Sequence, residues 1–389
     1  MESLPEGVDA AFREMNAVWA ADGPTGLGRL YPLPYFRAEM MGLDHTEVAR
    51  ILSQVRTFFD DGRNGDWIET WSTAGAEYSE RALRAEEDGR EATAGDYYLA
   101  ATACYFVAAY TIHAFQPIMA REVAHRQSID CYRRGHRYYA YTPEEFRFTH
   151  GGTPVRGYLR LPSDGAGPWP CVILIGGANS TKEENHATAN YFLRRGLAAL
   201  TFDGPGQGEY LQDFDRPMRK DAFAQVVSAA IDALVQDTRI DDRRIGVWGK
   251  ASGSIPALHA CAADQRVQAL ALHPATYRWS EFFDELPVLP QKLELAAFLG
   301  AHSFNDLTSL IAEEMTVDDV VASVPCPILA VNSEEDIIPS EQGYQLRAHA
   351  RTTVTVIVLP GQVHGGPPTI ALPLEADWLR SELSTQEGS

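Results

Sequence analysis

The sequence predicts an α/β protein in which a mostly parallel, doubly wound sheet follows a helical amino-terminal lobe. Two observations lead to this prediction. From residue 145 onward, apolar segments of strand length alternate with helical segments, which is the pattern of successive βαβ units. Before residue 140, helical periodicity prevails and strand patterns are scarce.

The length of 389 residues fits a catalytic domain with an appended lobe. We expect a helical cap or lid domain over residues 1–140 and a catalytic domain over residues 141–389. Hydrophobic residues make up 45% and charged residues 22% of the chain, which is ordinary for a globular protein. The composition therefore excludes a coiled coil or a disordered chain.

The lobe shows its helices most clearly between residues 44 and 140. Asp44 and Glu47 stand like an N-cap and its capping-box partner ahead of an amphipathic run. Further helical runs follow at residues 67–87 and 93–112. We expect this lobe to cover the active site.

The sheet begins where apolar residues alternate with polar ones, at residues 155–161. The later strand segments are continuously apolar, as in parallel strands covered on both faces. They read CVILIG, AALTFD, RIGVWG, VQALALH, PILAVN and TVTVIVL. Helical and aromatic sequence at about residues 275–323 interrupts the alternation, and we expect this excursion above the carboxyl edge of the sheet, where ligands bind.

Charge and cysteine content narrow the classes of partner. The net charge of -20 argues against nucleic acid, because phosphate backbones bind basic surfaces. The five cysteines show no CxxC pairing, so we expect reduced thiols, no metal and no other cofactor. We find neither a leader pattern nor an apolar run of membrane-spanning length, and we expect a cytoplasmic protein without a membrane partner.

The chemistry is indicated by Gly249-Lys250-Ala251-Ser252-Gly253, which follows a strand and precedes a helix. This is the spacing of the nucleophile elbow of the α/β-hydrolase fold, in which the central residue projects above the sheet. The central residue here is Ala251, where the chemistry requires a serine. Alanine has no nucleophilic atom, so this polypeptide cannot form an acyl-enzyme at that position.

Three interpretations of Ala251 compete. The first is an inactivating substitution in a hydrolase, the second a natural pseudoenzyme, and the third a nucleophile shifted to Ser252. A shift would put Lys250 and Ser254 at positions where the turn favours residues without bulk. We favour the first interpretation, because the rest of the site is intact.

The remaining members of a catalytic triad follow in the chain order of this fold. Asp336 lies after a late strand and is our first choice for the acid, with Glu335 as the alternative. His364 lies in a glycine-flanked loop after the last strand and is the expected general base. The backbone N–H groups of Ala178 and Ser252 are expected to form the oxyanion hole.

Three strings together resemble a known family: GGANSTKEE at residues 176–184, FDGPGQGE at residues 202–209, and the elbow, all behind a helical lobe. The chain resembles the α/β-hydrolases related to 2,6-dihydroxypseudooxynicotine hydrolase, to fungal hydrolases of pigment polyketides and to FrsA-like esterases. The resemblance implies a serine at position 251, His364 as base, Asp336 as orienting acid, and a homodimer. This chain departs from the family pattern at the nucleophile, where it has Ala251.

Several members of that family cleave a carbon–carbon bond next to a carbonyl, and others are esterases. The resemblance thus implies a small aromatic or polyketide-like carbonyl substrate. The competing functions are a carboxylesterase, lactone hydrolase or acyl transferase, and a non-catalytic binding protein on a hydrolase scaffold. Cleavage next to a ketone favours an apolar, aromatic-lined pocket, for which the excursion offers Tyr277, Trp279 and Phe282. We expect His113 and His186 to be structural.

Overall fold

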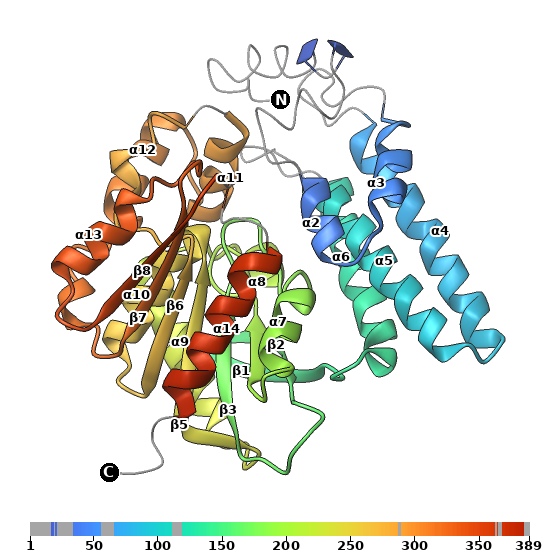
Figure 1. Ribbon diagram of the computed structural model, residues 1–389. Coiled ribbons are helices and arrows are strands. Elements are labelled where there is room, and N and C mark those ends of the chain that lie inside the picture. The colour runs from blue at the N-terminus through green and yellow to red at the C-terminus, as the bar shows by residue number, and fades with distance from the viewer. Residues whose placement is uncertain are drawn as a thin grey trace. The chain divides into compact units, whose positions relative to one another are not determined.

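The computed structural model describes residues 17–18, 20–21, 34–55, 66–110, 119–286, 289–361, 364 and 368–384 (Figure 1). The chain divides into two compact units. The helical unit comprises Met1–Thr142, Leu286–Ala297 and Ala301–Phe304, and the sheet unit comprises Pro143–Glu285, Phe298–Gly300 and Asn305–Ser389. Each unit is described below by itself.

The regular elements of the helical unit are all helical in its described part. They are α2 (Pro34–Met40), α3 (His45–Leu52), α4 (Trp67–Glu87), α5 (Glu91–Ala109), α6 (Met119–Gly135), the short helix η1 (His136–Tyr138) and most of α11 (Leu289–Leu299). The helix predicted at residues 67–87 is confirmed at both ends. Helix α5 ends at Ala109, so Tyr110 of the predicted second run lies just after it, and residues 111–112 lie outside the described residues.

The start of α3 confirms one half of the predicted capping box. The Asp44 carboxylate accepts the Thr46 N–H at 2.7 Å, as an N-cap should. The Glu47 carboxylate instead accepts hydrogen bonds from Arg50 Nε and Arg50 Nη2, each at 2.7 Å. The Glu47 carboxylate therefore pairs with Arg50, one turn further along the helix, and not with the cap.

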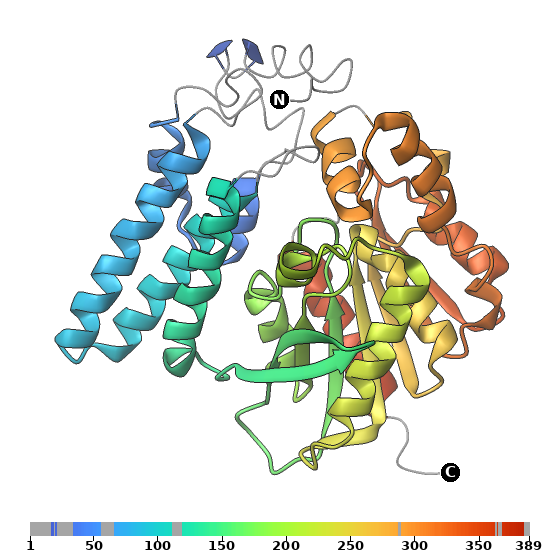
Figure 2. The same cartoon turned by 180° about the vertical axis from the view of Figure 1, so that it is seen from behind.

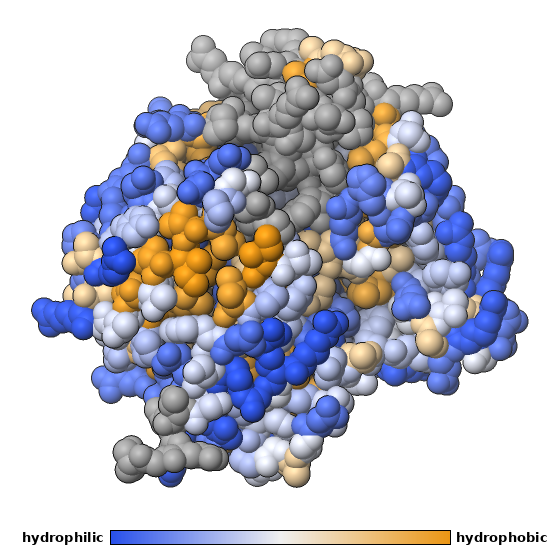
Figure 3. All heavy atoms as spheres, viewed as in Figure 1, coloured by the Kyte–Doolittle hydropathy of each residue, from blue (hydrophilic) through white to orange (hydrophobic). Residues whose placement is uncertain are grey.

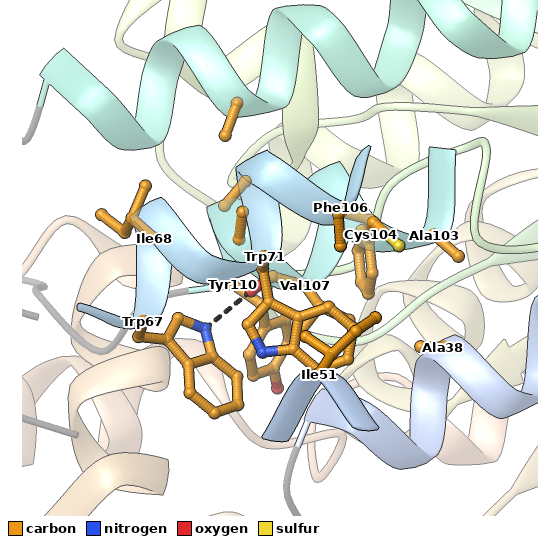
Figure 4. Close-up of a cluster of buried hydrophobic side chains, with 14 of the residues drawn as sticks. Ala38, Ile51, Trp67, Ile68, Trp71, Ala103, Cys104, Phe106, Val107 and Tyr110 are labelled. Carbon is orange, nitrogen blue, oxygen red and sulfur yellow. Dashed lines mark hydrogen bonds between the residues drawn. The ribbon is translucent and has the colours of Figure 1, made fainter. Parts of the chain in front are cut away.

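The core of the helical unit is built around two tryptophans of α4 (Figure 4). Trp67 and Trp71 are buried with ring centroids 5.7 Å apart, and Trp67 Nε1 donates to Val107 O at 3.0 Å. Leu293, from helix α11 (Leu289–Leu299), packs in this cluster. Part of the excursion that the sequence assigns to the catalytic domain thus groups with the helical unit.

The sheet unit contains one eight-stranded sheet in the order β1-β2-β4-β3-β5-β6-β7-β8. Strands β3 to β8 pair in parallel, whereas β2 is antiparallel to β1 and β4. The mostly parallel sheet predicted from the sequence is therefore confirmed. The strands are β1 (Glu144–His150), β2 (Thr153–Arg160), β3 (Trp169–Ile175), β4 (Ala198–Phe202), β5 (Ile240–Lys250), β6 (Val267–His273), β7 (Ile328–Ser333) and β8 (Val354–Leu359).

Helices cover both faces of this sheet, as Figures 1 and 2 show from opposite sides. Helices α9 (Lys220–Leu234) and α10 (Ser254–Ala263) pack together on one face, and α7 (His186–Leu193) and α14 (Pro368–Ser384) on the other. The remaining elements are α8 (Gly208–Phe214), η2 (Ala251–Gly253), η3 (Trp279–Glu281), α12 (Phe304–Glu314), η4 (Val321–Ser323) and α13 (Glu341–His349). This two-sided cover explains why the central strands are apolar throughout.

Candidate active site

The elbow lies where β5 ends at Lys250 and α10 begins at Ser254. Ala251 between them has a φ of 52°, in the left-handed region that non-glycine residues seldom adopt. The two flanking glycines, Gly249 and Gly253, have no room for a side chain. A Cβ on Gly253 would lie 2.4 Å from Gly176 O, and one on Gly249 would lie 2.8 Å from Ala257 Cβ. The strained turn that the spacing predicts is thus present around an alanine.

Ala251 keeps the backbone conformation without the side chain that would use it. A left-handed alanine costs about 1–2 kcal/mol relative to a right-handed one, and the fold around it maintains this conformation. The turn is secured from the helix side, since the buried Ser254 Oγ donates to Pro274 O at 2.8 Å. The methyl group of Ala251 therefore stands where a serine hydroxyl would be presented.

A histidine–carboxylate pair follows the last two strands. His364 Nδ1 lies 2.9 Å from Asp336 Oδ1, and the same carboxylate oxygen accepts the Ile338 N–H at 3.0 Å. The Asp336 side chain is fully buried, whereas that of His364 is 27% exposed. A carboxylate on Nδ1 favours the proton on that nitrogen and leaves the lone pair on Nε2. His364 can therefore act as a general base.

Glu335 does not share this arrangement. Its residue is exposed, and its neighbour Glu334, also exposed, accepts the Gly361 N–H at 3.3 Å. Of the acidic residues that the sequence offers after β7, Asp336 is the one that contacts His364.

Topology brings the elbow and this pair to one edge of the sheet. Ala251 follows β5, Asp336 follows β7 and His364 follows β8. Strands β5, β6, β7 and β8 are parallel neighbours, so their carboxyl ends lie together. The order of nucleophile position, acid and histidine is that of an α/β-hydrolase site.

The predicted oxyanion-hole donor is already engaged. The Ala178 N–H donates to Ser252 Oγ at 2.6 Å, and Ser252 is only 3% exposed. A Cβ on Gly177 would lie 3.1 Å from the same hydroxyl oxygen. An oxygen of a substrate could reach the Ala178 N–H only by displacing Ser252 Oγ. The buried position of Ser252 also makes it a poor nucleophile for an incoming substrate.

Gln207 connects the loops after β3 and β4. Its Nε2 donates to Gly176 O at 2.6 Å and to Gly177 O at 3.3 Å, while its Oε1 accepts the Gly204 N–H at 3.2 Å. Gln207 is 2% exposed. It thereby fixes the backbone just before Ala178. Its place in the FDGPGQGE string is the sequence signal for this role, which sequence reasoning missed.

A buried ionic cluster joins the same two strings. Lys182 Nζ lies 2.8 Å from Asp203 Oδ2, 3.0 Å from Glu183 Oε1 and 2.6 Å from Glu209 Oε2. Lys182 is 1% exposed. Burial lowers the pKa of Lys182, but Asp203 and the neighbouring carboxylates outweigh it and hold the pKa well above its usual value. The ammonium therefore stays charged.

This cluster explains why both strings contain so many charged residues. The Lys182 N–H donates to Asp203 Oδ1 at 2.8 Å, and the Glu209 N–H donates to Asp203 Oδ2 at 3.1 Å. A Cβ on Gly208 would lie 2.3 Å from the Asp203 carboxylate. The charges thus fix the backbone of the two loops beside the elbow.

The three aromatic residues predicted to line a substrate pocket are buried in the protein. The Tyr277 ring stacks on His349 with centroids 5.0 Å apart, and Trp279 lies 5.1 Å from Phe282. Trp279 Nε1 has no hydrogen-bond partner within the described part of the chain. Tyr277 and Phe282 are therefore accounted for by packing, whereas Trp279 keeps an unused donor.

Of the two histidines expected to be structural, His186 lies within the described residues and His113 does not. His186 is buried, and burial lowers its pKa well below the usual value, with the Arg160 charge adding to this effect. It is therefore a neutral imidazole at physiological pH. His113 lies outside the described residues.

The described residues contain neither a metal-binding cluster nor a membrane-spanning helix. No group of three or more histidine, cysteine, aspartate and glutamate side chains there could hold a metal ion. Among the same residues, no helix has the length and apolar character needed to cross a membrane.

Comparisons with known proteins find similar sequences among hydrolases and esterases. A 2,6-dihydropseudooxynicotine hydrolase of Paenarthrobacter nicotinovorans is 26% identical over 279 residues, which are 70% of this chain and 72% of that protein. An esterase FrsA of Pectobacterium atrosepticum is 33% identical over 148 residues, which are 38% of this chain and 34% of the esterase. The chain thus spans about a third of that esterase's length.

Solved structures show the same fold. The crystal structure of the 2,6-dihydroxy-pseudo-oxynicotine hydrolase matches with a TM-score of 0.79 at 23% identity, over 90% of this chain and 95% of that one. A structure of AbyA5 matches with a TM-score of 0.66 at 23% identity, over 87% of this chain and 93% of that one. The fold is therefore that of the α/β-hydrolases.

The family model of the FrsA-like esterases matches residues 55–383. This match covers most of the helical lobe as well as the sheet, the elbow and the residues that follow it. The chain belongs to the FrsA-like esterase family of α/β-hydrolases.

Proposed function

We propose that this site binds a small aromatic or polyketide-like ketone and that, with serine at position 251, it hydrolyses the carbon–carbon bond next to the carbonyl. The observation that supports this most directly is the His364–Asp336 pair, 2.9 Å apart at the edge where the elbow turns. Such a pair activates a hydroxyl for attack on a carbonyl.

The proposed roles are those of a serine hydrolase. Asp336 orients the imidazole through Nδ1, and Nε2 takes the proton from the serine hydroxyl as that oxygen attacks the carbonyl carbon. The same proton then goes to the leaving carbon when the bond breaks. The acyl group stays on the serine oxygen until water, deprotonated by His364, releases it as a carboxylic acid.

The chain with Ala251 stops before the first of these steps. It has no hydroxyl to attack with, so no acyl-enzyme forms at the elbow. Binding is a separate matter, since alanine removes one oxygen atom and adds no bulk. We propose that this chain holds its substrate intact.

The unpaired Trp279 Nε1 supports a ligand with an oxygen acceptor. This N–H is buried, and a buried donor left without an acceptor costs about 1–3 kcal/mol. A carbonyl or phenolic oxygen of a bound ligand would satisfy it. Trp279 follows β6. In the sheet, β6 lies between β5, the strand before the elbow, and β7, the strand before Asp336.

Ester or lactone hydrolysis is the second candidate, and the family favours it. Both reactions use the same attack, but an ester expels an oxygen leaving group, whereas a ketone must expel a carbanion that needs an enol or phenol to stabilise it. A third candidate, a binding protein without catalysis, follows from Ala251 itself. The kind of leaving group that the enzyme expels, carbon or oxygen, distinguishes ketone cleavage from ester hydrolysis.

The test is the Ala251→Ser variant, assayed against 4-nitrophenyl esters and against aromatic β-diketones. We expect the variant to hydrolyse the diketones and the original chain to lack this activity. Faster turnover of simple esters would favour the esterase. A variant that turned over neither class, although the original chain bound such ligands tightly, would leave the binding protein. Ala251→Ser with His364→Ala is the matched control, because it restores the hydroxyl without the base.

A further inference from the structure

A second histidine–carboxylate pair is buried beside the strand that leads into the elbow. Glu375, on helix α14, is fully buried. Its Oε2 accepts the Trp248 Nε1–H at 2.6 Å, and its Oε1 lies 2.5 Å from His273 Nδ1. A buried carboxylate is costly to keep, and an apolar residue would fill the same space at lower cost. The carboxylate of Glu375 therefore indicates a role other than packing.

Both partners of Glu375 lie at the ends of the strands that present the elbow. Trp248 is on β5, three residues before Ala251. His273 is the last residue of β6 and pairs in register with Lys250, the residue directly before Ala251. Glu375 thus joins α14 to both strands just before the turn.

Helix α14 runs antiparallel to β5 along the sheet (Figure 1). Glu375 contacts Trp248. Leu379 and Leu383, further along the helix, lie against Gly246, since a Cβ there would be 3.3 Å and 3.2 Å from their methyl groups. Later residues of α14 therefore contact an earlier residue of β5. The amino-terminal end of α14 points toward the carboxyl edge of the sheet, where the elbow turns.

His364 lies just before this end of α14. The helix begins at Pro368, four residues after His364. Four residues span at most about 14 Å even when fully extended, so the start of α14 limits where the imidazole can lie. Two helical turns, about 10 Å, separate Pro368 from Glu375. A shift or rotation of α14 would therefore move His364 relative to Ala251.

Apolar contacts alone do not fix the rotation of α14, because the helix is apolar on more than one side. Ile370 and Leu374 are 45% and 42% exposed, and Figure 3 shows apolar side chains gathered over β8 and the amino-terminal end of α14. The buried side carries Ala371, Leu372, Ala376 and Leu379 around Glu375. A carboxylate bound to two donors accepts one rotation of the helix and not its neighbours, which is how a buried polar group specifies register.

We propose that Glu375 is a positioning residue for the catalytic base. Its contacts with Trp248 and His273 fix α14 against β5 and β6. This anchor holds His364 within reach of the side chain at position 251, although Glu375 itself does not touch the reacting atoms. The inference rests on the proposed function, because the place of His364 affects catalysis only when residue 251 is a serine.

The test uses the Ala251→Ser form of the full chain and a fluorophosphonate. The serine oxygen bonds to phosphorus, fluoride leaves, and the histidine takes the hydroxyl proton. We expect Glu375→Met in this background to slow labelling at least roughly tenfold, since a displacement of about 1 Å can cost about 100-fold. Glu375→Gln should restore most of the rate, because the amide can accept from Trp248 and donate to His273 Nδ1 in the other tautomer.

Asp377→Met is the matched control. Asp377 lies on the same helix, but its side chain is 70% exposed and pairs with Arg195, so its replacement should leave the labelling rate unchanged. Circular dichroism checks that each form is folded. Should Glu375→Met not fold, Trp248→Phe takes its place, because it removes one donor and keeps an aromatic ring. It should slow labelling at least roughly threefold.

An unchanged labelling rate in the folded Glu375→Met or Trp248→Phe form would overturn the positioning role. Glu375→Gln labelling as slowly as Glu375→Met would do the same, because the hydrogen bonds would then not be the anchor. Labelling does not depend on the natural leaving group. An Ala251→Ser form that is labelled rapidly, and slowly with Glu375→Met, but turns over neither ketones nor esters would contradict the proposed function and support the role of Glu375.

Discussion

Asp336 and His364 come from separate loops, yet their side chains meet at 2.9 Å between Oδ1 and Nδ1. The buried Asp336 Oδ1 also accepts the Ile338 N–H at 3.0 Å, which fixes the carboxylate from a second side. The pair is thus held in the geometry of a hydrolase even though the chain has alanine at the elbow. Having alanine at position 251 has not disrupted the contact between His364 and Asp336.

We first predict the contribution of Asp336 in the Ala251→Ser background. Asp336→Asn should lower kcat roughly 10⁴-fold, since the imidazole would lose the carboxylate that holds its tautomer and stabilises its charged form. Steady-state kinetics on the preferred substrate measure this effect. Glu335→Gln is the control and should leave kcat unchanged, because Glu335 is exposed. The reverse pattern would make Glu335 the acid.

The second prediction concerns the buried Lys182. Lys182→Met should lower the free energy of unfolding by about 3–5 kcal/mol, because it leaves buried carboxylates without their counter-charge. Denaturant unfolding of the sheet unit, followed by circular dichroism, measures the loss. Asp203 and Glu183 are 2% and 1% exposed, so water cannot replace the ammonium.

Lys220→Met is the control for that variant. Lys220 pairs with Asp319 at 3.0 Å, but the Asp319 side chain is 54% exposed. Exposed pairs contribute about 0–1 kcal/mol, so this loss should be small. Equal effects of the two variants would show that the buried cluster adds nothing beyond an ordinary surface pair.

Local patterns made most of the fold predictable. Helix α4 was predictable over its full length, since its period and its flanking polar residues are local properties. The elbow was predictable because glycines at 249 and 253 are required by close contacts of the backbone. Asp336 and His364 followed from chain order and from their places after strands.

Contacts between distant segments were not predictable in the same way. Nothing local shows that Lys182 is buried against Asp203, or that Gln207 holds the loop before Ala178. The sequence gives the residue types but not which partners the fold brings together. The hydrogen bond from the Ala178 N–H to the Ser252 hydroxyl was also not predictable, because it joins residues that are 74 positions apart in the chain.

The third prediction concerns the cysteines, which are all buried and free of disulfides. Burial raises the pKa of Cys131 to about 11, so its thiolate is scarce at pH 8. We expect the folded chain to react slowly with Ellman's reagent and all five thiols to react after denaturation. Rapid labelling of the folded chain would show that these thiols are reached through opening of the structure.

The last prediction concerns Ser252, whose hydroxyl oxygen occupies the Ala178 N–H. In the Ala251→Ser background, Ser252→Ala should raise kcat about fivefold. An oxyanion would no longer have to displace a competing acceptor, and one such hydrogen bond contributes about 1 kcal/mol. Steady-state kinetics of the two forms measure the ratio.

Ser254→Ala is the matched control for this effect. Ser254 is also a buried serine near the elbow, but its hydroxyl donates to Pro274 O and does not contact Ala178. Its replacement should lower stability by roughly 1 kcal/mol without raising kcat. If kcat fell in Ser252→Ala while Ser254→Ala left it unchanged, the Ser252 hydroxyl itself would be a donor to the oxyanion. The Ala178 N–H would then act through Ser252, by holding that hydroxyl in place.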